Sequence, residues 1–267
     1  MMTTLKRPQS HEAGFTLAEL LITVAIIGFV LAAVLGVYRA TQQTALVGTA
    51  AEDAQVVTRL ILQRIVTDLQ LINAGRPTSA DAITAASATS VTFLGDVNND
   101  TLNAGNNATL TQAAASGDTT VKVSSAQGFA VGELFSVRSG TFAETQLITN
   151  IAGPNLTLAA GLSNPTGYPV GSIARAVETV TYTWTAAAGG TLTRTINGAP
   201  DTLATNVQTF QLTYWQGTVP AVQILNPNTQ ALRDQIKQIG ISLACLAQSG
   251  DQTVVRALMT TVRPRNL

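Results

Sequence analysis

The residues best suited to chemistry in this chain stand where a short polar leader meets an apolar run. Gly14 ends the leader, and from Phe15 to Tyr38 the only charged residue is Glu19. A secretory signal peptide has its small-residue cleavage site after the apolar region, so that region is lost on cleavage. Here the small residue comes first, which predicts that the chain is cut before its apolar segment and keeps that segment.

Glu19 needs a reason to stand in an apolar run, because a carboxylate in hydrocarbon is costly and usually marks a functional contact. Cleavage after Gly14 would create a new α-amino group on Phe15. Helices staggered side by side could then bring the amine of one chain to Glu19 of another, so we expect an assembly contact. The alternative is that Glu19 lies near enough to the membrane interface to reach water.

The apolar run itself predicts a membrane anchor over residues 17–38, because about 20 apolar residues suffice to cross a bilayer. Lys6 and Arg7 precede this run and would hold the leader, residues 1–14, on the cytoplasmic side. We therefore expect a single pass through the membrane with the C-terminal domain outside the cytoplasm.

The run Gly14-Phe15-Thr16-Leu17, with Glu19 following, resembles the signal of type IV pilins and type II secretion pseudopilins. The resemblance implies cleavage between Gly14 and Phe15 by a prepilin peptidase, N-methylation of Phe15, and docking of subunits through Glu19. It also implies a bacterial inner-membrane precursor that meets an assembly platform, joins other pilins, and ends in a pilus or at the cell surface. Ala18 departs mildly from the family, which usually has Ile or Val there.

A stem helix is predicted over residues 15–75, because no proline occurs from Phe15 until Pro77 and Asn73-Ala74-Gly75 supplies a stop signal. In its second half, apolar residues recur every three or four positions, with charged and polar residues off this stripe. The stripe comprises Ile61, Ile65, Leu69 and Ile72, and the residues off it include Arg59, Arg64, Asp68 and Gln70. This half should pack one face on a globular domain.

Alternating apolar residues predict strands in residues 76–100 and 175–267. The predicted strands are 90–94, 180–184, 192–196, 210–214, 239–245 and 258–262, with the turn pair Asn197-Gly198 after the third. We expect one antiparallel sheet laid across the apolar stripe of the stem. The fold class is therefore α+β.

Residues 101–174 look like an insertion in this sheet. They separate 90–96 from 178–182, which could pair as a hairpin, and they carry strand patterns of their own at 119–123, 134–138, 145–151 and 155–159. We expect a small all-β module at a filament surface. It either recognises a partner or acts as a spacer.

The strand pattern from Val180 to Asn266 resembles W-type minor pilins and the related J-type pseudopilins. This second resemblance implies a minor subunit that lies near the tip of a filament or primes its assembly.

Little in the chain points to catalysis. The only histidine, His11, lies in the leader, so the processed chain would lack Ser-His-Asp, Cys-His and histidine-metal sites. The only cysteine, Cys245, alternates with Ile241 and Leu243 and is predicted to be a core residue. We expect no enzyme, no cofactor and no metal centre.

One weak calcium pattern remains. Asp96, Asn98 and Asp100 have the spacing that begins an EF-hand loop. Thr101 stands where that loop needs glycine, and Asn107 stands where it needs a bidentate glutamate. An ordinary turn rich in Asp and Asn is the favoured alternative.

A basic group near the C-terminus, Arg256, Arg263 and Arg265, could contact DNA or a protein partner. The chain has 15 basic and 15 acidic residues, so it lacks the broad positive charge of most DNA-binding proteins. The alternative is a solvated strand edge or a contact with a neighbouring subunit.

Together these features predict a minor type IV pilin, a structural subunit of a pilus that serves adhesion, twitching motility or DNA uptake. The alternatives are a type II secretion pseudopilin and a membrane-tethered binding or enzymatic domain that does not polymerise.

Overall fold

The computed structural model describes residues 16–76, 81–98, 102–103, 106–249 and 252–267. The chain divides into two compact units, residues 1–49 and 50–267. Of the predicted site residues, Gly14, Phe15 and Asp100 lie outside the described residues.

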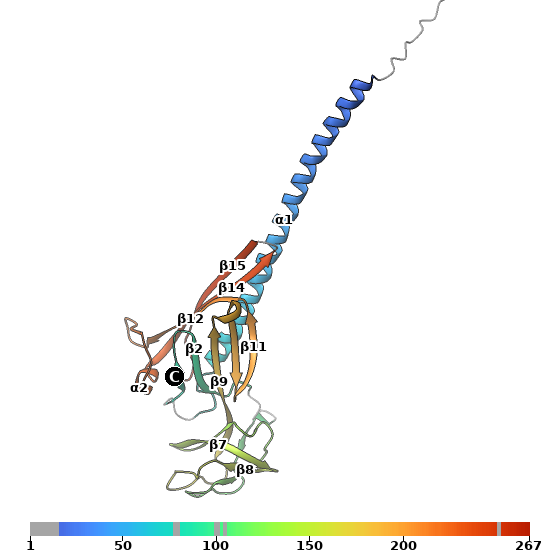
Figure 1. Ribbon diagram of the computed structural model, residues 1–267. Coiled ribbons are helices and arrows are strands. Elements are labelled where there is room, and N and C mark those ends of the chain that lie inside the picture. The colour runs from blue at the N-terminus through green and yellow to red at the C-terminus, as the bar shows by residue number, and fades with distance from the viewer. Residues whose placement is uncertain (1–15, 77–80, 99–101, 104–105, 250–251) are drawn as a thin grey trace, which may run out of the picture. The chain divides into compact units, whose positions relative to one another are not determined.

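The long N-terminal helix is confirmed. Helix α1 (Leu17–Gln70) runs for 54 residues (Figure 1). In the first unit its apolar side chains are exposed, and it is the one helix in the described part of the chain that is long and apolar enough to cross a membrane. In the second unit its predicted stripe is buried, with Ile65 and Leu69 completely inaccessible.

The helix ends at Gln70, earlier than the predicted residue 75. Leu71 and Ile72 each donate a backbone hydrogen bond three residues back, which tightens the last turn. Asn73 then adopts a left-handed φ of 64°, and its N–H donates to the Leu94 carbonyl at 2.7 Å. Pairing with a strand therefore replaces the continuation of the helix.

The first sheet over the helix is built around the long strand β9 (Ile173–Thr185). Strand β2 (Ser90–Gly95) pairs with it antiparallel, with Phe93 opposite Val180, so the expected pairing of 90–96 with 178–182 is confirmed. Strand β1 (Ile83–Ala86) pairs with β2. On the other side of β9 lies β10 (Thr191–Ile196), followed by β11 (Ala199–Thr205) after a hairpin turn. Asn197 and Gly198 both have positive φ there, as the turn pair predicts.

A second sheet has the strand order β13-β12-β14-β15. Its strands are β12 (Val207–Gln216), β13 (Gln223–Ile224), β14 (Ile236–Ser249) and β15 (Gln252–Val262), and a short helix, α2 (Gln230–Arg233), precedes β14. The prediction of a single sheet is therefore wrong. Asn206, with a φ of 60°, turns the chain between β11 and β12, so the later strands start a new sheet.

Both sheets share one hydrophobic core with the second half of the helix. Ile61, Ile65, Leu69 and Ile72 meet Phe93, Val180 and Tyr182 from the first sheet and Phe210, Ile241 and Leu243 from the second. The helix therefore packs on antiparallel sheets, and the α+β prediction is confirmed.

Residues 102–158 contain the remaining strands. They are β3 (Leu102–Asn103), β4 (Asn106–Thr109), β5 (Thr120–Lys122), β6 (Leu134–Ser139), β7 (Phe142–Ala152) and β8 (Asn155–Leu158). Strand pairing runs β9-β6-β7-β8-β5, and β4 pairs with β9 on its other side. A bridge between Leu110 and Val123 joins the ends of β4 and β5, so the ring closes.

This closed sheet has a core of its own, built from Phe135, Val137, Ile148, Leu156, Tyr168 and neighbours. Strand β9 belongs to both cores, because Ala174 and Ala176 lie in the second and Val180 and Tyr182 in the first. The division of the chain at residues 101 and 174 stays our prediction.

Candidate assembly site and other candidate sites

Glu19 lies in the first turn of α1, where it forms a reciprocal cap with Thr16. The Glu19 carboxylate accepts hydrogen bonds from the Thr16 N–H and the Thr16 hydroxyl, both at 2.9 Å. In return, the Glu19 N–H donates to Thr16 Oγ1 at 3.2 Å. This is a capping box, in which two otherwise unpaired helix N–H groups are satisfied. Thr16-Leu17-Ala18-Glu19 carries its Thr-x-x-Glu signature, which we did not predict.

The cap leaves Glu19 able to make further contacts. Both Thr16 bonds go to one oxygen, Oε2, and the residue is exposed in the single chain. An ionised carboxylate has about four lone-pair sites, so at least half of its accepting capacity remains. The capping box fixes the position of the carboxylate at the helix start, where a cation from another chain can reach it.

Asp68 is a buried charge that our sequence analysis placed off the apolar stripe. It is 2 % exposed, and its Oδ2 accepts hydrogen bonds from Arg194 Nε on β10 and from the Tyr182 hydroxyl on β9, at 2.6 and 2.7 Å. Burial first, and then the neighbouring Asp68 carboxylate, raise the pKa of the Tyr182 hydroxyl. The helical spacing gave a signal, since Asp68 stands three residues after Ile65 and seven after Ile61.

The predicted calcium turn is only partly described. Asp96 is buried, Asn98 is exposed, and the Val97 N–H between them donates to the buried Glu178 carboxylate at 2.8 Å. Within the described residues there is no group of three or more His, Cys, Asp or Glu side chains that could hold a metal ion. Calcium binding by Asp96, Asn98 and Asp100 stays a prediction.

The predicted C-terminal basic group is spread out. Arg256 and Arg263 are seven positions apart along an extended chain, which is about 23 Å and places their side chains on opposite faces. Arg263 Nε donates to the Gln238 side chain at 3.2 Å, and the Arg265 N–H donates to the Gln70 carbonyl at 3.4 Å. The structure does not bring these arginines to one point, and contact with DNA or a partner stays a prediction.

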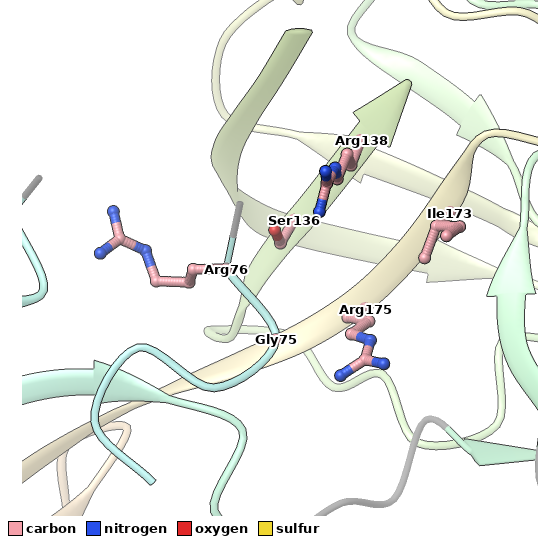
Figure 2. A pocket seen from close by; sticks show the side chains of 6 residues that line it. All are labelled: Gly75, Arg76, Ser136, Arg138, Ile173 and Arg175. Carbon is pink, nitrogen blue, oxygen red and sulfur yellow. The ribbon is translucent and has the colours of Figure 1, made fainter. Parts of the chain in front are cut away.

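A hollow of about 210 Å³ is lined by Gly75, Arg76, Ser136, Arg138, Ile173 and Arg175. None of these six described residues is acidic. Figure 2 shows the guanidinium groups of Arg76 and Arg175 pointing away from each other. Burial lowers the pKa of Arg76, and the charges of Asp81 and Asp234 oppose that shift. The charges do not converge, so the hollow is not a preformed anion site.

Cys245 is 3 % exposed, as predicted for a core residue. Burial raises the pKa of its thiol, while a hydrogen bond with the Thr58 side chain acts in the other direction. A buried thiol with a raised pKa is a poor nucleophile.

Comparison with known proteins gives one match. The family model of the prokaryotic N-terminal methylation motif matches residues 9–35, the segment that contains Gly14, Phe15 and Glu19. Searches of curated proteins and of solved structures found no match.

The chain therefore carries the type IV prepilin-like signal. More particularly, the motif supports a type IV pilin-like or pseudopilin-like protein, and it implies processing by a prepilin peptidase and assembly with other pilins. The signal and the apolar helix together support an inner-membrane anchor that carries a C-terminal domain and is later associated with a pilus.

Proposed function

We propose that this chain is a minor type IV pilin, a structural subunit with no enzymatic role. The observation that carries the proposal is the methylation motif at residues 9–35, followed directly by a helix whose exposed first half can cross a membrane. The second half of the same helix forms the core of the extracytoplasmic domain. Such a stem can anchor the subunit before assembly and pack among other stems afterwards.

In this proposal, Glu19 acts through its charge. After cleavage, the α-amino group of Phe15 on one chain pairs with the Glu19 carboxylate of a neighbouring chain, which compensates both charges away from water. The capping box supports this role, because it orients the carboxylate through Thr16 while leaving one oxygen unused. Capping and pairing are separate properties of the same side chain.

Three substitutions separate the helix-capping role of Glu19 from its charge-pairing role. Glu19→Gln keeps an amide oxygen that can still close the capping box but removes the charge. Glu19→Ala removes both, and Thr16→Ala removes the hydroxyl partner alone. We expect Glu19→Gln and Glu19→Ala to abolish recovery of the chain in sheared surface filaments. The Thr16→Ala variant should be recovered there at most of the wild-type amount.

Each variant is also measured in the membrane fraction, where all three should accumulate as the wild type does. Mass spectrometry of the wild-type chain should find an N-methylated Phe15 as the first residue. Incorporation of Glu19→Gln at the wild-type level would refute charge pairing. A wild-type chain that is processed but absent from surface filaments would favour a pseudopilin, and one that keeps its leader would favour a tethered domain.

A further inference from the structure

Strand β15 (Gln252–Val262) is the outermost strand of its sheet, at the free edge of the β14–β15 hairpin (Figure 1). All of its residues pair with β14 in one continuous register, from Ser249 opposite Gln252 to Ile239 opposite Val262. The other edge of the sheet is β13, which has only two residues. Beyond β13, the Val207 and Leu212 N–H groups of β12 donate to the Gly190 and Ala88 carbonyls. The longest free edge of the second sheet is therefore β15.

The register shows which backbone groups face outward. The Leu246 N–H donates to the Asn206 carbonyl at 2.8 Å, on the side of β14 away from β15. Leu246 and Val255 are thus a non-hydrogen-bonded pair, and the N–H and C=O of Val255 point to the free edge. The same holds at every second residue along the strand, namely Thr253, Val255, Ala257, Met259 and Thr261.

These outward groups have no hydrogen-bond partner in the part of the chain that the structure describes. The side chains of the same residues are exposed as well, and Val255 and Met259 are 40 % and 80 % exposed. Just beyond the strand, the Arg265 N–H does have a partner, the Gln70 carbonyl. The outward backbone N–H and C=O groups that lack a partner therefore belong to β15 itself.

Strand β15 has few of the usual protections of an edge strand. The pairing of β14 with β15 contains no bulge, the strand contains no proline, and Arg256 is its only charged residue. Natural proteins block long free edges with bulges, prolines and charges, because an open row of N–H and C=O groups accepts another strand. An edge left open in this way indicates a strand-binding surface.

We propose that the free edge of β15 pairs with an extended segment of a neighbouring subunit in the filament. Only another extended backbone matches donors and acceptors that alternate at this spacing. Apolar side chains on the incoming segment would cover Val255 and Met259. This inference rests on the proposed function, and it names the surface through which globular domains join.

Hydrogen exchange of the full-length chain tests the proposed pairing of the β15 edge without a mutation. In detergent, the amides of Thr253, Val255, Ala257, Met259 and Thr261 should exchange rapidly, while those of the intervening residues, bonded to β14, are protected. In sheared filaments the same outward amides should slow by about tenfold or more. Outward amides that exchange equally fast in filaments and in detergent would overturn the proposal.

A substitution provides the second test. Ala257→Pro removes an outward N–H without removing any hydrogen bond to β14, and an edge position of this kind tolerates proline. The matched control, Ala257→Val, keeps the N–H. We expect Ala257→Pro to lower the amount of chain in filaments about tenfold relative to Ala257→Val, with both variants present in the membrane.

The outcomes separate this inference from the proposed function. If the wild type enters filaments but Ala257→Pro enters equally well, the strand-pairing inference is wrong and the pilin proposal stands. If the wild type itself is absent from filaments, the pilin proposal fails and this inference fails with it. If Ala257→Pro does not fold, the exchange of the wild-type amides decides.

Discussion

Asp68 and Arg194 show how single buried residues fix the helix to the first sheet. Their side chains are 3 % and 6 % exposed and meet at 2.6 Å, and Tyr182 adds a second hydrogen bond to the same carboxylate oxygen. Arg194 Nη2 has no hydrogen-bond partner within the described residues. The guanidinium therefore depends on Asp68 for its charge compensation.

We expect Asp68→Ala to lower the free energy of unfolding by about 3–5 kcal/mol, because it leaves the buried guanidinium of Arg194 uncompensated. Urea denaturation of the full-length chain in detergent measures this loss. Replacing both partners, as Asp68→Leu with Arg194→Met, should recover part of it, since no buried charge then remains.

Arg64→Ala is the matched control. Arg64 contacts the other carboxylate oxygen of Asp68 at 3.5 Å, but its side chain is 54 % exposed. Removing an exposed helical pair of this kind should cost about 0.5 kcal/mol or less. Equal losses in Asp68→Ala and Arg64→Ala would show that the buried pair contributes no more than the surface contact.

At the scale of elements, Gly190 is one of the points where the two sheets meet. It follows the 3₁₀ helix Ala187–Gly189, has a φ of 83°, and accepts the Val207 N–H at the start of β12. A Cβ at this position would overlap the Val207 carbonyl oxygen. The close approach of β10 to β12 therefore requires glycine.

Gly190→Ala should destabilise the fold by about 3 kcal/mol or more, because it adds a steric clash to the cost of a backbone conformation that alanine avoids. Gly198→Ala is the control, since Gly198 has nearly the same φ, 85°, and nothing within 4 Å of an added Cβ. The Gly198→Ala variant should lose only about 1–2 kcal/mol of its free energy of unfolding. Thermal unfolding of both variants measures the difference, and similar melting temperatures would contradict the role of the close approach.

At the scale of the whole molecule, two hydrophobic cores raise the question of whether the inserted residues are needed for folding. Among the described residues, no fully buried member of the core shared by the helix and its two sheets lies between Phe93 and Val180. The closed sheet keeps its own core within residues 108–176. Among the described residues, β9 contributes buried side chains to both cores.

We predict that replacing residues 101–174 with a short Gly/Ser linker leaves the first core folded, because β2 and β9 still pair from Gly95 opposite Glu178 onward. Circular dichroism and the reactivity of Cys245 toward a thiol reagent measure whether the first core is folded in this variant. A folded variant keeps Cys245 unreactive until urea is added. Immediate reaction of the thiol would show that the domain division we propose is wrong.

The features that depend on near neighbours in the chain could be predicted from the amino-acid sequence. The processing signal, the long helix, its apolar stripe, and strands such as 134–138 and 210–214 all follow from local composition and from periods of 3.6 and 2 residues. The capping box of Thr16 and Glu19 belongs to this class too, since three residues separate its partners. It was readable from the sequence although we did not predict it.

Which elements pair and which polar groups are buried became known from the three-dimensional fold. Two sheets instead of one, the closed ring through Leu110 and Val123, and the pairing of Asp68 with Arg194 all join residues far apart in the sequence. Alternation of apolar and polar residues shows that a strand has a buried face, but many other strands or helices could pack on that face equally well. The choice among them depends on packing and charge compensation across the whole core, which no local pattern contains.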